Sequence, residues 1–340
     1  MDNSERKRQD DMDGDMRKRR DDMDGDKRKR RDMDRDKRKR RDMDGNKRKH
    51  WDEWLSSPYL WILPSLLLMF IVIFIPIVEL FMTSFSTISL AGVRKGFNGL
   101  DNYVAIFQDD TFYLVLKNTL VWTIFVVGIS TALSMGIAVL LNRKFPGRKI
   151  VRAALIVPWA VSLIITAAIW KWILDYNYGT FNYLLTKLNI INENIYWLAN
   201  PSLSFPAMIG VGIFVTIPFT SFVLLSGLQS ISNDLYEAAS VDGADGWGKF
   251  WRITLPLLKQ PLTVSLVLNT IYVFNSFPII WTMTQGDPVN KTDTVITYLY
   301  KLAFQSSKMG EAAAVSVISF LILLMFTLFY VYMTFRKESS

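Results

Sequence analysis

The segment 243–249 has the spacing G-x-x-x-x-G-K, which resembles a loop that cradles nucleotide phosphates in all but its last position. Phe250 follows, where such a loop needs a Ser or Thr to bind Mg²⁺, and no strand is expected before the first glycine. Asp245 would place a negative charge inside the loop and repel phosphate. The sequence therefore predicts no nucleotide site here.

Residue types also limit other chemistry. The chain has no cysteine and a single histidine, His50. Disulfides, thiolate catalysis and Cys-ligated metals are excluded, and no second imidazole is present for a catalytic triad or a His-based metal site. We predict that the chain has no catalytic residues, no metal site and no cofactor of its own.

Residues 232–256, here called the elbow, predict two short helices joined by a turn. Ser232 or Asn233 can cap the first helix, and Gly243 can supply its left-handed stop. Asp245 can cap the second, which is expected to run to the end of the elbow. A rigid elbow with small side chains suits a groove in a soluble partner. An ordinary amphipathic loop at a membrane surface is the alternative.

Polar side chains in the apolar runs on either side of the elbow are candidates for a solute path, because a polar solute needs hydrogen-bonding groups inside a helix bundle. After the elbow, Asn269, Tyr272 and Ser276 are expected to share one helix face, with Asn275 away from it. The run before the elbow offers Thr216, Phe219, Thr220 and Ser221. The alternative is that these groups only join neighbouring helices by hydrogen bonds.

These residues require helices that cross a membrane. A helix needs roughly 20 apolar residues to cross a hydrocarbon core of ~30 Å. Six charge-free runs are candidates: 60–78, 118–142, 153–170, 201–233, 260–286 and 312–335. The sequence predicts an all-α membrane protein with six transmembrane helices in residues 55–340 and the elbow between the fourth and fifth. Pro64, Pro76, Pro158 and Pro218 are expected to kink their helices.

The link after the second run sets the expected orientation. It carries five basic residues and no acid, namely Arg143, Lys144, Arg148, Lys149 and Arg152. Basic links stay in the cytoplasm. We therefore expect the N-terminus, the elbow and the C-terminus to be cytoplasmic, and the first, third and fifth links to face outward.

Residues 1–50 form a charged repeat. They hold 21 of the 39 Lys and Arg residues and 15 of the 31 Asp and Glu residues, in units close to MDGDKRKRRD. Such a segment cannot bury a core, so it is expected to be a disordered cytoplasmic tail. Binding to anionic lipid is the alternative, while the interleaved aspartates argue against nucleic acid.

The elbow also contains the pattern EAA, three residues, Gly, nine residues and I-x-L-P. It resembles the signature loop of binding-protein-dependent ABC importer permeases. The matching residues are Glu237, Ala238, Ala239, Gly243, Ile253, Leu255 and Pro256, and Asp242 lies among them. The longer stretch YEAASVDGADGWGKFWRITLPLL is similar to the sugar permeases, and the start at PYLWILPSLLLMF resembles the maltose-permease-F-like partner. The resemblance covers about residue 55 to the C-terminus.

This resemblance implies the function. Similar proteins import sugars by alternating access in a bacterial cell membrane. They pair with a second, unlike permease, two ABC ATPase subunits that use ATP and Mg²⁺, and an extracytoplasmic sugar-binding protein. The elbow residues would couple to the ATPases, and the helices beside the elbow would line the sugar path.

Two other functions remain as alternatives. An ion-coupled secondary transporter predicts buried carboxylates and an internal repeat, and neither is seen in the sequence. A membrane scaffold with a lipid-binding tail predicts that deleting residues 1–45 destroys function.

Overall fold

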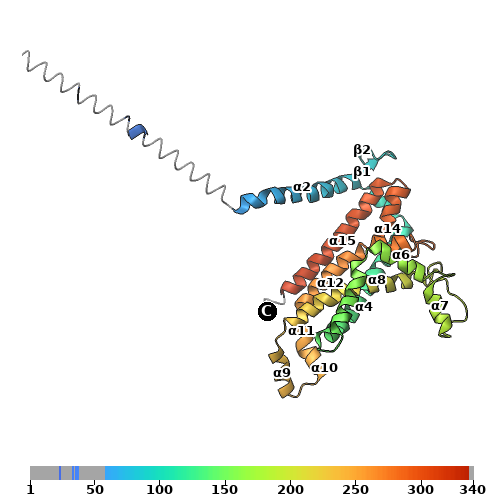
Figure 1. The fold of residues 1–340 in the computed structure, drawn as a ribbon. Coiled ribbons are helices and arrows are strands. Elements are labelled where there is room, and N and C mark those ends of the chain that lie inside the picture. Colours follow the sequence, from blue (N-terminus) through green and yellow to red (C-terminus); the bar gives the residue numbers. More distant parts are fainter. Residues whose placement is uncertain (1–22, 24–32, 34, 38–57, 337–340) are drawn as a thin grey trace, which may run out of the picture. The chain divides into compact units, whose positions relative to one another are not determined.

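The computed structural model describes residues 23, 33, 35–37 and 58–336 (Figure 1). The predicted charged tail, 1–50, therefore lies outside the described residues except at those first five positions. The chain divides into two units, 1–76 and 77–340. Helix α2 (Pro58–Ser84) begins in the first unit; it contains Pro64 and Pro76, and its apolar stretch is exposed.

The other elements of the described chain follow in order. They are β1 (Ser86–Ile88), β2 (Arg94–Phe97), α3 (Asp101–Phe107), α4 (Asp110–Asn142), α5 (Arg148–Ala160), α6 (Leu163–Ile173), α7 (Thr180–Lys187), α8 (Ser204–Gln229), α9 (Asn233–Val241), α10 (Gly246–Lys249), a π-helical segment (Phe250–Thr254), α11 (Leu255–Leu257), α12 (Lys259–Phe274), α13 (Phe277–Met283), α14 (Val295–Tyr300), a second π-helical segment (Lys301–Gln305) and α15 (Met309–Arg336). Strands β1 and β2 form a short antiparallel hairpin that pairs Ser86 with Phe97.

Four described helices, α2, α4, α8 and α15, are long and apolar enough to cross a membrane. Two bent pairs raise the number to six if each pair is one span: α5 with α6 at 99°, and residues 246–257 with α12 at 65°. The mainly helical fold of a multi-pass membrane protein is confirmed. The predicted runs 60–78, 118–142, 201–233 and 312–335 each coincide with most of one of the four long helices.

Two of the predicted runs are not continuous helices: a bend was expected at Pro158 in the run 153–170, and no break was predicted in the run 260–286. The run 153–170 breaks at Val161 and Ser162, whose ψ angles of 143° and 139° are extended. The run 260–286 breaks after Phe274, and a new helix starts with Pro278 in its first turn, where the missing N–H costs nothing. Hydropathy reports how apolar a segment is and does not report whether its backbone stays helical.

The core of the second unit forms where α4, α8 and α12 pack together (Figure 1). Gly212 of α8 permits the close approach, because a Cβ at this position would lie 2.8 Å from the Trp122 ring of α4. The same indole donates a hydrogen bond from Nε1 to the carbonyl oxygen of Val273 on α12, at 2.9 Å. Trp122 thus joins three helices by packing and by a buried hydrogen bond.

Candidate functional sites

The elbow consists of α9, a turn and the helical stretch from α10 to α11. Ser232 caps α9 by accepting a hydrogen bond from the N–H of Asp234, and Gly243 adopts a left-handed φ of 78° in the turn. Asp245 Oδ1 accepts the N–H of Gly248 at 2.7 Å and caps α10. These three predicted signals are confirmed, although the second helix contains a π-helical segment that was not predicted.

Two side-chain contacts hold the elbow to itself. Tyr236 Oη lies 3.0 Å from the buried Thr254 Oγ1, and Lys249 Nζ donates to Ser240 Oγ at 2.6 Å. Trp247 remains 69% exposed. Among the predicted coupling residues, Ala239, Ile253 and Leu255 are half-buried, and the exposed ones are Glu237, Ala238, Asp242, Gly243 and Pro256. The elbow therefore presents a preformed surface to solvent.

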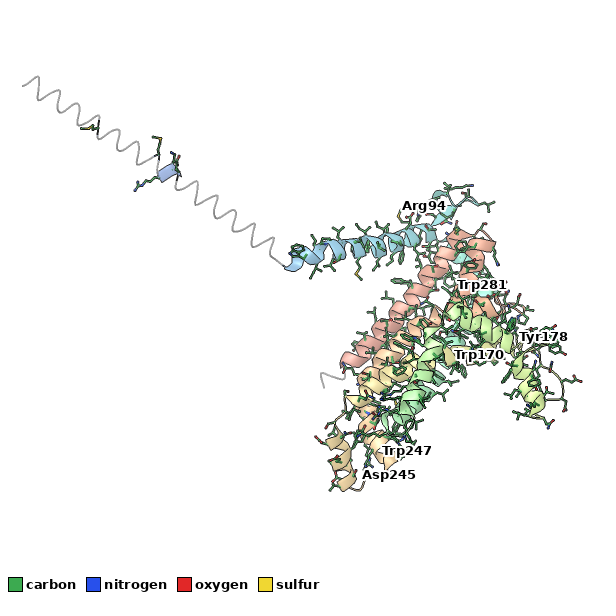
Figure 2. The ribbon with its side chains drawn as sticks, in the orientation of Figure 1. Arg94, Trp170, Tyr178, Asp245, Trp247 and Trp281 are labelled. Atoms are coloured by element: carbon green, nitrogen blue, oxygen red, sulfur yellow. The ribbon has the colours of Figure 1, made fainter. Side chains whose placement is uncertain are left out.

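Both ends of the elbow connect to long helices, α8 before it and α12 after it. Asp245 and Trp247 lie at the opposite end of the second unit from Arg94 and Trp281 (Figure 2). A displacement of the elbow would therefore act directly on two helices of the packed core. The arrangement suits transmission of motion along the bundle.

Several of the predicted path residues form the contact between α8 and α12. Asn269 is buried, and its Nδ2 donates to Thr220 Oγ1 at 2.8 Å and to Ser265 Oγ at 3.2 Å. Thr216 and Thr220 also donate to carbonyl oxygens one turn earlier in α8, and Phe219 is half-buried. In this conformation these hydroxyl and amide groups are engaged in helix packing, while their role in a solute path remains a prediction.

The prediction that Asn269, Tyr272 and Ser276 share one helix face was wrong. Tyr272 is exposed where Asn269 is buried, and α12 ends at Phe274, so the helical period does not extend to Ser276. Ser276 is instead the buried N-cap residue of α13. Asn275 is exposed and donates from Nδ2 to the carbonyl oxygen of Ile271.

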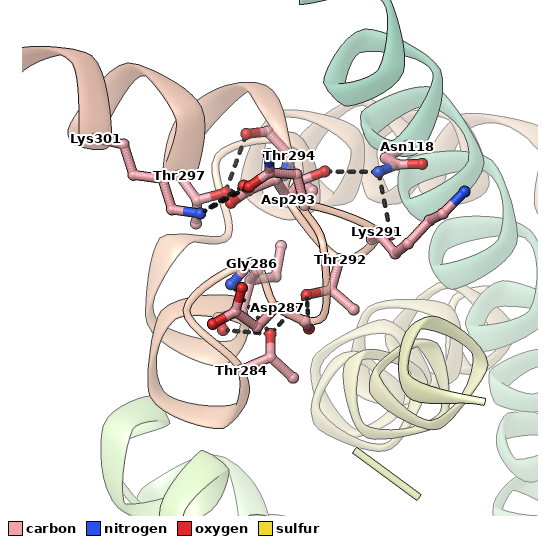
Figure 3. A network of polar contacts seen from close by, with 12 residues as sticks. Asn118, Thr284, Gly286, Asp287, Lys291, Thr292, Asp293, Thr294, Thr297 and Lys301 are labelled. Carbon is pink, nitrogen blue, oxygen red and sulfur yellow. Dashed lines mark hydrogen bonds and ion pairs between the residues drawn. The ribbon is translucent and has the colours of Figure 1, made fainter. Parts of the chain in front are cut away.

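A network of polar groups around the buried Asp293, here called the polar clasp, consists of Asn118, Thr119, Asp293, Val295 and Lys301. Figure 3 shows Asn118, Asp293 and Lys301 of this network. Asn118 Nδ2 donates to the carbonyl oxygen of Asp293 at 2.9 Å, and Thr119 Oγ1 accepts the N–H of Val295 at 2.8 Å. Lys301 Nζ pairs with Asp293 Oδ2 at 2.6 Å, and the Asp293 side chain is 1% exposed. The clasp ties α4 to the segment that leads into α14.

Burial raises the pKa of Asp293 above its ordinary value, because the carboxylate loses its hydration, while the Lys301 ammonium opposes this effect. The turn that precedes Asp293 has little room for other side chains or backbone conformations. Gly286 has φ 92°, and a Cβ there would collide with the Asp293 carboxylate. Thr292 Oγ1 donates to the carbonyl oxygen of Asp287 at 2.7 Å (Figure 3). The segment is therefore closely packed around one buried charge.

A cleft of about 610 Å³, here called the aromatic cleft, opens between the segments 171–199 and 283–289. Its lining includes Lys171, Asp175, Tyr176, Tyr196, Trp197 and Asp287. The Tyr176 and Tyr196 rings stack in parallel with their centroids 3.7 Å apart. The sequence reasoning missed this cleft. Its only signal was the presence of several aromatic residues in a polar link between apolar runs.

Several bundled helices of membrane length define a multi-pass membrane protein. Residues 124–338 match the family described as binding-protein-dependent transport system inner membrane component. The chain belongs to this family, so it is a permease of an ABC transport system, as the resemblance of the elbow predicted.

Individual relatives extend the match over most of the chain. A probable ABC transporter permease of Brucella suis biovar 1 (strain 1330) is 50% identical over 285 residues, covering 84% of this chain and 99% of that protein. The trehalose/maltose transport system permease protein MalF of Thermococcus litoralis is 36% identical, with 82% and 94% covered. A crystal structure of a bacterial importer of the polysaccharide alginate matches with a TM-score of 0.74 and 26% identity, covering 84% of this chain and 96% of that one.

Proposed function

We propose that the chain is the permease subunit of an ABC importer that carries a sugar or a sugar derivative across a bacterial cell membrane. The supporting observation is its similarity, over 82% and 85% of the chain, to permeases named for trehalose and maltose and for sulfoquinovosyl glycerol. The similar crystal structure belongs to an importer of an acidic polysaccharide. The substrates of these relatives are all carbohydrates or their derivatives.

The topology that we propose has six crossings, namely α2, α4, α5 with α6, α8, α12 with α13, and α15, and leaves the elbow outside the membrane. The basic link between α4 and α5 supports a cytoplasmic position for that end, for the elbow and for both termini. The segments 171–199 and 283–289 then belong to links that face outward. Charge in the links and the length of the apolar helices support this arrangement.

The elbow is the proposed coupling element. Glu237, Ala238, Asp242, Gly243 and Pro256 lie exposed on it, and its own hydrogen bonds hold its shape. An ATPase subunit would bind this surface, and hydrolysis of ATP with Mg²⁺ by the two ATPases of the complex would move α8 and α12 between two arrangements. The permease binds no cofactor and catalyses no reaction in this mechanism.

The remaining partners follow from the same proposal. A second, unlike permease completes the transmembrane path, and an extracytoplasmic sugar-binding protein delivers the sugar. A neighbouring crystal structure shows such an importer, for alginate, with its periplasmic protein bound. We propose that Asn269, Thr216, Thr220 and Phe219 become available to the sugar when α8 and α12 move apart. Tyr272 and Asn275 at the end of α12 and Ser276 at the start of α13 would extend the same path.

The test uses Glu237→Lys and Gly243→Pro in the complete transporter. Glu237→Lys reverses the charge on the proposed docking face, and Gly243→Pro is incompatible with the left-handed turn. Each is expected to reduce both co-purification of the ATPase and sugar uptake by about tenfold or more. Asp101→Lys, an exposed charge reversal in α3 outside both the elbow and the 171–199 segment, is the matched control and should behave as wild type.

Normal ATPase binding and normal uptake in both elbow variants would contradict the coupling role. An ion-coupled mechanism would be recognised by uptake that needs an ion gradient and no ATPase. If the purified chain alone accumulates sugar in vesicles when an ion gradient is applied, the chain is not a passive subunit driven by ATPases, and the proposed function fails.

A further inference from the structure

We propose that the aromatic cleft is a sugar-binding subsite at the outward-facing end of the permease, occupied before the sugar enters the helix bundle. This inference rests on the proposed function and on its orientation. It assigns a ligand, a carbohydrate ring, to residues that the sequence did not point to. The central residues are Tyr176, Tyr196, Lys171 and Asp287.

The cleft has the size and position that such a subsite needs. Its volume of about 610 Å³ lies within the usual range of small-molecule sites, roughly 300–1,000 Å³. Both of its walls lie toward the outward-facing side in the proposed topology: 171–199 in the third link, and 283–289 from the last residue of α13 into the fifth link. A sugar released on that side of the membrane would meet this cleft without crossing any apolar helix.

The chemistry of the lining suits a hydroxyl-rich ring. Tyr196 is 54% exposed, so part of its ring is open to a ligand although Tyr176 covers one face. Flat aromatic surfaces pack against the C–H faces of sugars, and exposed polar tips hydrogen-bond their hydroxyls. Lys171 offers donors, while Asp175 and Asp287 offer acceptors. Donors and acceptors together suit sugar hydroxyls, because each hydroxyl can both donate and accept a hydrogen bond.

The wall formed by 171–199 is preorganised. Asn182 is buried; its Oδ1 accepts the indole N–H of Trp197 at 2.9 Å and the N–H of Ile195 at 3.2 Å. Asp175 Oδ1 accepts the N–H groups of Asn177 and Tyr178. A Cβ at Gly179 would collide with the backbone of Asp175, so the turn tolerates only glycine. A rigid wall binds a ligand without first being ordered.

The opposite wall is anchored by the bonds around the polar clasp. Thr284 Oγ1 lies 2.8 Å from Thr292 Oγ1, and Thr292 donates to the carbonyl oxygen of Asp287 at 2.7 Å (Figure 3). Lys171 Nζ lies 3.4 Å from the carbonyl oxygen of Thr282, so the ammonium approaches this wall from α6. The two walls are thus positioned independently of any sugar.

The experiment begins with the complete reconstituted transporter and labelled maltose, trehalose, sulfoquinovosyl glycerol and an alginate oligosaccharide. If none of the four is imported with ATP, the proposed function fails. The sugar that is imported then serves as the probe. Saturation-transfer NMR is recorded on the transporter in nanodiscs without the sugar-binding protein, alongside the KM of uptake with that protein present.

We expect wild type to transfer saturation to the sugar. Tyr196→Ala and Tyr176→Ala are expected to abolish this transfer and to raise the KM about tenfold, with binding-protein-stimulated ATP hydrolysis unchanged. Tyr183→Ala is the control, because Tyr183 is an exposed tyrosine of α7 outside the cleft. Lys171→Gln and Asp287→Asn test the same cleft, and because both side chains are exposed we expect the fold to be kept.

The inference is overturned if the imported sugar receives no saturation in wild type, or if the cleft variants match wild type in both saturation transfer and KM while transport persists. It is also overturned if the variants lose stimulation by the binding protein and keep normal saturation transfer. In that case the cleft would be a docking surface for the protein and not a site for the sugar.

Discussion

The elbow and the polar clasp use the same residue types in opposite ways. In the elbow, Asp245 lies exposed and caps a short helix at the surface. In the clasp, Asp293 is buried and paired with Lys301. An exposed cap costs little to form and leaves the surface free for a partner, whereas a buried ion pair is costly to break. The clasp therefore holds the fold, and the elbow is available for function.

This comparison predicts that clasp variants lose stability, whereas elbow variants lose coupling. Asp293→Ala provides the strongest test, because it leaves the Lys301 ammonium without its buried partner. We expect the free energy of unfolding to fall by about 3–5 kcal/mol. Denaturant unfolding in detergent, followed by tryptophan fluorescence, measures the change.

Glu311→Ala is the control for Asp293→Ala. It breaks the Lys308–Glu311 pair, in which the lysine is largely exposed. This variant should cost at most about 1 kcal/mol. If both variants lost the same free energy of unfolding, burial would not make the Asp293–Lys301 pair more important for stability than the Lys308–Glu311 pair.

Gly286 beside the polar clasp and Gly243 in the elbow both have a left-handed φ, so they allow the stability of the two regions to be compared directly. Alanine at Gly286 would both strain the backbone and collide with the Asp293 carboxylate, while Gly243 in the elbow has open space around it. Gly286→Ala should cost about 1–3 kcal/mol from strain alone, and more from the collision. Gly243→Ala should cost about 1–2 kcal/mol. The order of the two thermal midpoints checks this prediction, which fails if Gly243→Ala is the less stable variant.

Asp245→Ala tests the elbow without touching the core. Loss of the cap should weaken α10 by about 1 kcal/mol, while the thermal midpoint of the whole chain stays close to wild type. Sugar uptake should fall, because the surface that meets the ATPases loses its shape. Asp245→Asn keeps a capping oxygen and should retain uptake. A large drop in thermal midpoint for Asp245→Ala would place the elbow in the structural core.

The smallest expected effect is a pH dependence. Burial raises the pKa of Asp293 above 3.8, so the folded state holds this proton more tightly than the unfolded state. Wild type should therefore lose stability, relative to Asp293→Asn, as pH rises from about 4 to the raised pKa, and should change little above it. Thermal midpoints measured across this range test the sign.

Asp109, the N-cap of α4, should show the opposite sign. Burial pushes its pKa up, but hydrogen bonds from Tyr298 and Thr111 outweigh burial and hold the pKa below 3.8. Wild type should lose stability, relative to Asp109→Asn, as pH falls below about 3.8. If stability changed with pH in the same direction for both aspartates, the environments assigned to them would be contradicted.

Local signals in the sequence predicted much of the bundle and of the elbow. Ser232, Gly243 and Asp245 act within three residues of their own positions, so their roles could be inferred without a fold. The shared face of Asn269, Tyr272 and Ser276 could not be inferred, because it depended on a helix that ends at Phe274. Apolar composition alone does not reveal such a break.

By itself the sequence determined which segments are apolar enough to cross a membrane, where the elbow begins and turns, and to which family the chain is similar. These properties depend on neighbouring residues and on short-range hydrogen bonds. Only the tertiary structure decided the polar clasp and the aromatic cleft. Asn118 reaches Asp293, and Tyr176 shares a cleft with Asp287, across more than a hundred residues of chain. Such contacts are set by helix packing, which no local pattern encodes.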